Sequence, residues 1–188
     1  MAPHPKQTPP PSPIHSTLKH SLQIPPPMAA TSPPLGYQFD PEDYELINVL
    51  NHKLQNKPIP FDQTTHLDLY SNHPWVLLKD TQPAIKRTKE HVIYTPRYRA
   101  TGSTHITRRV LGGRVGIWKQ VSNFGYVVKI DGSDGNVVGR EMRFVFYEGD
   151  VNVGLVRKTD WYMTEFTNMD GDDDEFSICK LKFVAYRV

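Results

Sequence analysis

The chain has 188 residues, a formal net charge of +2 at pH 7, and 38% hydrophobic residues. This length allows one ordinary domain with a real core, together with a tail. A single cysteine, Cys179, excludes an internal disulfide framework and zinc sites built from two or more cysteines. No apolar run approaches the roughly 18 residues needed to span a bilayer. We therefore expect a soluble intracellular protein without a membrane segment.

Charge is distributed unevenly along the chain. Between Lys86 and Lys129 there are ten Lys or Arg residues and one acid, whereas between Asp131 and Glu175 there are twelve acids and four bases. A dense basic block within predicted strands is typical of a surface that binds a polyanion. The alternative is a solvated basic face that the acidic block neutralises after folding, and charge alone leaves both interpretations open.

Residues 1–34 form a compositionally distinct tail. They contain 11 of the 17 prolines, two lysines and no acid. Proline lacks a backbone donor and fixes φ, so we expect a disordered Pro-rich tail with polyproline II character. Its PPPSP run (9–13) has the form of a ligand for an SH3-type groove, but the composition favours a passive tail over that interpretation. The folded domain is expected to cover 35–188.

The first folded element is predicted to be an amphipathic helix ending near Leu54. Asp40 is a plausible N-cap and Pro41 a good first helical residue. The apolar residues at positions 46, 47, 50 and 54 form one stripe. After it, 66–78 predicts a short turn or helix that ends at Pro74, with Trp75 anchored in the core.

From residue 91 the pattern changes to β-branched and aromatic runs, which predict strands. The runs are 91–98, 114–121, 124–130, 140–149, 159–166 and 176–186. DGSDG (131–135) and NMDGDDDE (168–175) predict hairpin turns between them. An N-terminal helix followed by consecutive strands predicts an α+β domain with an antiparallel sheet under helical cover.

Motifs of catalysis are missing from the sequence. The eight histidines have no metal-ligand spacing, and there is no phosphate-binding glycine loop or nucleophile elbow. We therefore expect no enzyme, with no catalytic residue, metal site or cofactor. Cys179 is expected to be a buried strand residue.

The stretch RVGIWKQV (114–121) carries a Trp followed at once by a Lys. Side chains of consecutive strand residues point to opposite faces of a sheet, so Trp118 and Lys119 are predicted on opposite sides. If Trp118 anchors in the core, Lys119 is held rigidly toward solvent.

Seven segments resemble, in the same order, motifs of the plant NAC domain. They are PPLGYQFDPEDYELINVLNHK (33–53), LDLYSNHPWVL (67–77), VIYTPRYR (92–99), GIWKQ (116–120), GREMRFVFYEGDVNVG (139–154), KTDWYMTEF (158–166) and FSICKL (176–181). The corresponding family motifs are LPPGFRFxPTDEELVxxYLxxK, VDLYxxxPWxL, YFFSPRxR, GYWKA, GxKKxLVFYxGxxPKG, KTxWxMHEY and WVLCRV. The resemblance covers about 33–182.

The resemblance implies a twisted antiparallel sheet packed between N-terminal helices, in a nuclear, sequence-specific DNA-binding transcription regulator. The strand with WKQ would enter the major groove of double-stranded DNA, at a CGTG/CACG-type site. The implied DNA-binding residues are Arg97, Arg99, Arg108, Arg109, Arg114, Lys119, Gln120 and Arg140. The resemblance also implies a homodimer, or a heterodimer with related NAC-domain proteins, formed through the N-terminal segment with Gln38 and Glu45.

Several positions depart from the family pattern. Ala100, Asp150 and Val153 stand where basic residues are usual, and WKATG is replaced by WKQVS. Gln38 replaces the arginine that pairs with the acid retained here as Glu45. The alternative function is therefore an interaction module of the same fold, which dimerises with other family members after weakening or losing DNA binding.

Overall fold

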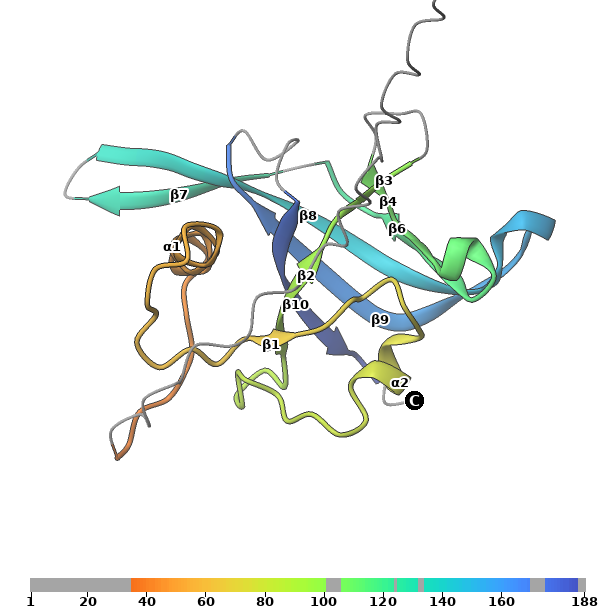
Figure 1. Ribbon diagram of the computed structural model, residues 1–188, viewed down its shortest axis with the longest axis horizontal. Helices are drawn as coiled ribbons and strands as arrows, with labels where there is room; N and C mark the ends of the chain where they lie inside the picture. Colours follow the sequence, from red (N-terminus) through yellow and green to blue (C-terminus); the bar gives the residue numbers. More distant parts are fainter. Residues whose placement is uncertain (1–34, 101–105, 124, 132–133, 170–174, 186–188) are drawn as a thin grey trace, which may run out of the picture.

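The computed structural model describes residues 35–100, 106–123, 125–131, 134–169 and 175–185 (Figure 1). The expected Pro-rich tail, residues 1–34, lies outside the described residues. The division of the chain at residues 34 and 35 therefore stays a prediction. The tips of both expected hairpin turns, 132–133 and 170–174, also lie outside.

The N-terminal helix α1 spans Asp43–Leu54 and begins later than predicted. Its N-cap is Glu42, whose backbone N–H donates to the Glu45 carboxylate at 2.8 Å. The predicted cap, Asp40, instead accepts hydrogen bonds from the Arg87 guanidinium at 3.1 and 3.3 Å. The Asp40 carboxylate therefore binds a residue distant in sequence and does not form the helix cap that the local sequence predicted. The predicted apolar stripe is confirmed, because Leu46, Ile47 and Leu50 are fully buried.

Among the described residues, eight strands form one curled sheet. Along the sheet the order is β1-β2-β10-β9-β8-β6-β5, and β7 pairs with β8 beside β6. The sheet is mixed, not wholly antiparallel as predicted, because β1 and β2 pair in parallel. The strands are β1 (Thr65–His66), β2 (His91–Pro96), β5 (Arg109–Val110), β6 (Gly116–Gln120), β7 (Gly125–Asp131), β8 (Asp134–Asp150), β9 (Leu155–Thr167) and β10 (Phe176–Phe183).

Short elements complete the fold. β3 (Tyr98–Arg99) and β4 (Ile106–Thr107) pair separately, and the 3-10 turns η1 (Leu111–Gly113) and η2 (Val151–Val153) lie at the ends of β5 and β8. Two-residue strands carry too little pattern for sequence reasoning, and β1, β4 and β5 were not expected.

Each face of the sheet has its own hydrophobic core. Alternation along β2 places Ile93 in one core and Val92 and Tyr94 in the other. The core on the α1 face is built from Leu46, Ile47, Leu50, Ile85, Val92, Tyr94, Val127, Phe166, Phe176 and Ile178. The core on the opposite face is built from Leu69, Tyr70, Leu78, Ile93, Val110, Trp118, Phe144, Phe146, Met163, Cys179 and Leu181.

Helical cover on the two faces is unequal. α1 packs on β7–β10, and Gly139 of β8 allows it to approach, because a Cβ there would lie 2.5 Å from Ile47 Cδ1. The other face is covered by residues 67–78 and the four-residue helix α2 (Pro74–Leu77). α2 begins at Pro74, where the sequence predicted an end, because proline suits a first helical turn. Trp75 is 37% exposed, so the prediction that it anchors the core is wrong.

Candidate nucleic-acid interface

Strand β6 presents Trp118 and Lys119 on opposite faces, as the sequence predicts. Trp118 is 2% exposed, and its ring centroid lies 5.1 Å from that of Phe146. Lys119 is exposed, and its ammonium nitrogen lies 4.3 Å from the centroid of the Tyr147 ring. This cation–π contact, together with the buried neighbour, restricts where the Lys119 charge can be.

Strand register assembles further basic residues beside Lys119. Arg109 lies directly opposite Ile117, Ile117 opposite Tyr147, and Tyr147 opposite Lys158. Directly opposed residues share a face of a sheet. We call the surface formed by Arg109, Ile117, Lys119, Tyr147 and Lys158 the Lys119 surface.

The loop at η2 lies against one end of the Lys119 surface. The Arg109 guanidinium donates to Asn152 Oδ1 at 2.9 Å, and Asn152 Nδ2 donates to the Gly112 carbonyl at 3.3 Å. Asp150 caps η2 by accepting from the Asn152 backbone N–H, while Val153 is 65% exposed. An acid and an apolar residue therefore lie close to Arg109.

Two of the expected DNA-binding residues point into the domain, Arg97 buried and Arg108 with a side chain only 11% exposed. Arg97 and Arg108 both pair with Glu165, which is 0% exposed. The Arg97 Nε to Glu165 Oε1 distance is 3.6 Å, and Ser177 Oγ donates to the same oxygen at 3.1 Å. The Arg108 guanidinium also lies 5.1 Å from the Phe144 ring centroid. The expectation that these two arginines reach DNA is corrected, because their charged groups face inward.

Burial governs the ionisation of this Glu165 cluster. Burial lowers the pKa of Arg108, but the Glu165 charge, the hydrogen bond to Glu165 and the interactions with Tyr70 and Cys179 together offset burial, so the pKa is raised overall. Burial also raises the pKa of Tyr70 well above its ordinary value, and the Glu165 charge raises it further. Arg108 thus stays charged and Tyr70 neutral throughout the physiological range.

The remaining expected DNA-binding residues lie in three different surroundings. Arg114 is exposed at the end of η1, next to β6, and Arg99 is exposed on β3. Arg140 is half-buried on β8. Gln120 follows Lys119 in β6 and so points to the opposite face, where its amide donates to the Ser122 carbonyl at 2.6 Å. The structure therefore places Arg109 and Lys119 on one face, leaves Arg114 exposed in the turn before β6, and directs Gln120 to the opposite face.

The expected dimerisation residues lie near the start of the described chain. Gln38 and Glu45 are both exposed and line the same cavity of about 310 Å³. One Glu45 oxygen already accepts the Glu42 backbone N–H. The carboxylate is thus held in place by the helix N-terminus.

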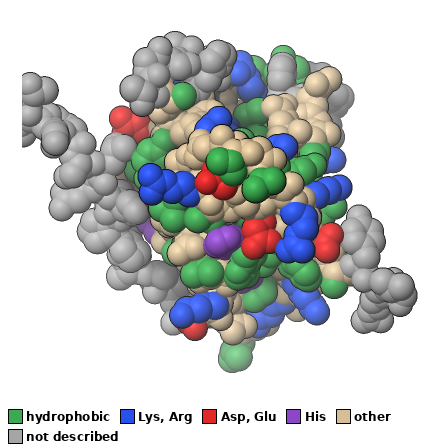
Figure 2. Space-filling model, turned by 90° about the vertical axis from the view of Figure 1, so that its right-hand side faces the viewer, with side chains coloured by type: hydrophobic (Ala, Val, Ile, Leu, Met, Phe, Trp, Pro, Cys, Tyr) green, Lys and Arg blue, Asp and Glu red, His purple; other side chains and the backbone are tan. Residues whose placement is uncertain are grey.

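Charges on the surface are mixed. Figure 2 shows Lys and Arg side chains interspersed with acidic and hydrophobic ones on the face that it presents. Within the ranges described, no cluster of three or more His, Cys, Asp or Glu side chains could hold a metal ion. In the same part of the chain, no helix is long and apolar enough to cross a membrane.

Sequence reasoning missed Lys158 and Tyr147 as parts of the Lys119 surface, and Glu165 as the partner of two arginines. The register between neighbouring strands places Lys158 and Tyr147 on this surface, and that register cannot be read from the local sequence. The acid near the end of the mostly apolar run WYMTEF (161–166) was a signal for Glu165, because a buried carboxylate requires partners.

Comparison with known proteins identifies the class. The family model for No apical meristem (NAM) protein matches residues 33–168. The chain therefore belongs to the NAC family, whose members are plant transcription factors and not enzymes.

Individual relatives agree with this family. NAC domain-containing protein JA2L of Solanum lycopersicum is 31% identical over 163 residues, covering 82% of this chain and 43% of that protein. NAC domain-containing protein 53 of Arabidopsis thaliana is 29% identical, covering 85% and 28%. NAC domain-containing protein 72 of Arabidopsis thaliana is 33% identical, covering 74% and 44%. The chain thus spans less than half the length of these relatives.

Proposed function

We propose that the protein is a sequence-specific DNA-binding transcription regulator that places β6 in the major groove. The observation that carries this proposal is the Trp118–Lys119 pair, with the ring locked in the core and the charge exposed. A ribbon of two strands has the width of the major groove, and β6 lies beside only the two-residue β5 at this edge.

The contacts divide by exposure. The proposed central contacts are Arg109, Arg114 and Lys119. Lys158 of β9 is added to them because only strand β8, with Tyr147, lies between Lys158 and Lys119. Arg99 and Arg140 are proposed as outer phosphate contacts. For Arg97 and Arg108 we propose a structural role, because both pair with Glu165 inside the domain.

A binding titration tests the proposal. Duplexes with a CGTG/CACG core and with a scrambled core would be titrated at several salt concentrations. We expect a preference for the first duplex, with a slope of about −0.9 in log K against log salt for each phosphate contact. Equal affinity for the two duplexes would contradict sequence-specific binding.

A second function is favoured by the surroundings of Arg109. Asp150 places a negative charge near this arginine, and two further arginines are buried. Both features reduce the charge available to phosphates. The alternative is an interaction module that pairs with other NAC-domain chains and binds DNA weakly, and the same titration separates it from the first.

Assembly and location follow from the same proposal. The proposed unit is a homodimer, or a heterodimer with a related NAC chain, in which Gln38 of one chain meets Glu45 of the other. A transcription regulator of this kind acts in the nucleus. Residues 35–188 are proposed as the DNA-binding domain, and residues 1–34 as a disordered Pro-rich tail.

A further inference from the structure

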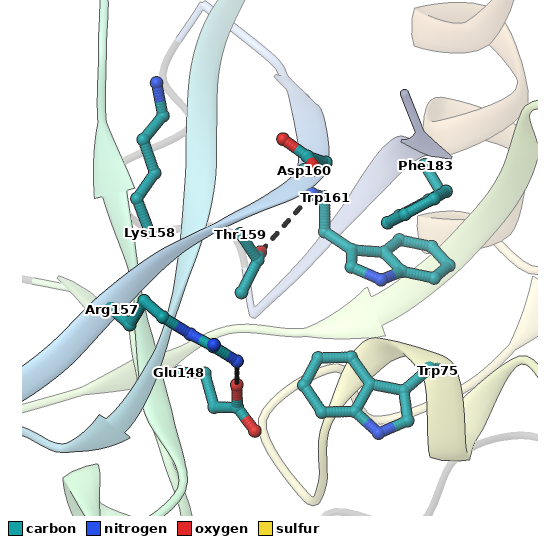
Figure 3. A pocket seen from close by; sticks show the side chains of 8 residues that line it. All are labelled: Trp75, Glu148, Arg157, Lys158, Thr159, Asp160, Trp161 and Phe183. Atoms are coloured by element: carbon teal, nitrogen blue, oxygen red, sulfur yellow. Dashed lines mark hydrogen bonds and ion pairs between the residues drawn. The ribbon is translucent and has the colours of Figure 1, made fainter. Parts of the chain in front are cut away.

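An open groove lies on the face of the sheet opposite most of the Lys119 surface, and Lys158 of β9 stands at the rim that the two share. Its volume is about 620 Å³. Figure 3 shows the rings of Phe183, Trp161 and Trp75 in succession along one side, with the Arg157–Glu148 ion pair on the other. Trp75 and Phe183 are 37% and 54% exposed. The groove is therefore lined by accessible aromatic rings on one side and by charged groups on the other.

A bulge in β9 shapes this groove. Val145 pairs with Tyr162 and Tyr147 pairs with Lys158, so three residues of β9 lie opposite the single Phe146. They are Thr159, Asp160 and Trp161, and all three line the groove. Bulges of this kind turn side chains away from the regular pleat and are frequent beside binding sites.

The rings are held in place by packing. The Trp75 ring centroid lies 4.4 Å from that of His73 and 6.0 Å from that of Phe146, and the Trp161 and Phe183 centroids are 5.6 Å apart. Little side-chain freedom would therefore be lost when a ligand binds, which favours affinity.

Hydrogen-bond donors in the groove are unused. Among the described residues, the indole N–H groups of Trp75 and Trp161 make no hydrogen bond. An indole nitrogen only donates, so its partner would be an acceptor. Aromatic rings combined with free donors match a polyproline II segment, whose backbone carbonyls have no internal partners.

We propose that this groove binds the PPPSP run, residues 9–13 of the same chain. In a polyproline II helix with three residues per turn, Pro10 and Pro13 lie on one edge and can contact neighbouring rings together. Within the first 34 residues, no other two prolines are three positions apart. The inference does not depend on DNA binding.

Reach and charge are consistent with this occupant. The 21 residues between Pro13 and Leu35 can extend over about 65 Å at ~3.1 Å per residue, which exceeds the diameter of a domain of this size, about 40 Å. The tail contains Lys6 and Lys19 and no acid, and the groove offers Asp160, which makes no ion pair among the described residues, with Lys158 only at the rim shared with the Lys119 surface. Linkage in one chain gives an effective concentration on the order of millimolar, so a weak contact suffices.

The test uses the full chain labelled with ¹⁵N. Its three tryptophans give three indole signals, which Trp75→Phe and Trp161→Phe variants assign. The triple variant Pro10→Ala, Pro11→Ala, Pro13→Ala should shift the signals of Trp75 and Trp161 and leave that of the buried Trp118 in place. The matched triple Pro25→Ala, Pro26→Ala, Pro27→Ala should leave all three in place.

Adding the peptide KQTPPPSPIH (6–15) to the first variant should return both signals, saturably, to their original positions. The same peptide with alanine for each proline should have no effect. The proposal is overturned if the first variant and the unmodified chain give identical signals, or if the second triple causes the shift. Signals of the unmodified chain that change on tenfold dilution would assign the groove to a second copy and overturn the proposed contact within one chain.

Discussion

Arg108 and Arg109 are adjacent in sequence but differ completely in their surroundings. Arg108 is paired with the buried Glu165 and packed on Phe144, whereas Arg109 is exposed and contacts Asn152. Strand alternation sends the two side chains to opposite faces. A count of basic residues therefore overstates the charge that a ligand meets, since part of the basic block stabilises the fold.

The two surroundings also differ in how a charge contributes to folding stability and to binding of a polyanion. A buried ion pair offsets a large desolvation cost, so removal of one partner leaves the other uncompensated. An exposed charge has little to lose on folding and remains available to a polyanion. Stability and DNA affinity should thus respond to different members of one sequence block.

The largest expected effect concerns the buried side of this comparison. Glu165→Gln keeps the volume but removes the buried carboxylate that pairs with Arg97 and Arg108. We expect the free energy of unfolding to fall by about 3–5 kcal/mol, measured by urea denaturation. Glu148→Gln removes the partner of the exposed Arg157 and should cost less than about 1 kcal/mol. Equal losses in the two variants would show that burial does not distinguish the pairs.

The exposed side is tested by Lys119→Ala. Binding to the CGTG/CACG duplex should weaken, and the salt slope should become shallower by about 0.9 if one phosphate contact is lost. The urea midpoint should change little, because the exposed side chain has little packing to lose. Gln120→Ala is the matched control from the opposite face and should change the affinity less. A larger effect from Gln120 than from Lys119 would reverse the proposed orientation of β6.

The η2 loop lies next to the exposed Arg109 and carries Asp150 and Val153, which lack the positive charge usual in the family. Asp150→Asn together with Val153→Lys removes one negative charge and adds one positive charge near Arg109. Asparagine keeps a side-chain oxygen that can cap η2. Affinity for specific and scrambled duplexes should rise alike, because phosphate contacts carry no sequence information. The salt slope should steepen by about 0.9 if the new lysine reaches a phosphate. An unchanged slope would place this loop away from DNA.

Periodicity was sufficient for much of the fold. The stripe of α1, the long strands β6–β10 and the burial of Trp118 and Cys179 followed from the sequence, because each depends on alternation within one element. The exposure of Lys119 followed for the same reason. The dense charge block contains Arg109 and Lys119 of the Lys119 surface, whereas Lys158 lies outside that block.

Features that depend on distant partners did not follow. Asp40 was assigned to the helix cap because Arg87, 47 residues away, was not foreseeable as its partner. Arg97 and Arg108 resembled surface arginines until the fold placed Glu165 between them. Trp75 looked like a core residue, yet the β9 bulge leaves it beside an open groove.

A smaller effect is expected at the proposed dimer contact. Gln38→Arg would restore a charged, bidentate partner for Glu45 of a second chain, which a neutral amide replaces only in part. Self-association should tighten by about thirtyfold at most, because exposed pairs contribute about 0–1 kcal/mol each and a two-fold dimer has two of them. Sedimentation velocity over a range of concentrations measures it. A dimer of the unmodified protein that does not dissociate on dilution would contradict a weakened contact.

The smallest effect concerns a cluster of intermediate burial, Lys53, Asp62 and His66. Lys53 Nζ lies 2.5 Å from the Asp62 carboxylate and 2.8 Å from His66 Nε2, which can accept only while the ring is neutral. Burial, followed by the Lys53 charge, lowers the pKa of His66. The unfolded chain then binds a proton more readily than the folded one, so the stabilisation is present above an unfolded pKa of about 6.5 and is lost as pH falls through the folded value.

Urea unfolding at a series of pH values from about 7.5 to about 5.5 tests this linkage, which spans the unfolded pKa. The free energy of unfolding of the unmodified protein should decrease over that range. In His66→Gln it should decrease less, because the glutamine side chain can accept a hydrogen bond from Lys53 but does not titrate. His91, whose pKa burial also lowers, is unchanged in both proteins and accounts for part of the remaining decline. His91→Gln is therefore the matched control, and adding it to His66→Gln should flatten the dependence further. If the free energy of unfolding of His66→Gln decreases as steeply with falling pH as that of the unmodified protein, protonation of the half-buried His66 ring is not linked to folding.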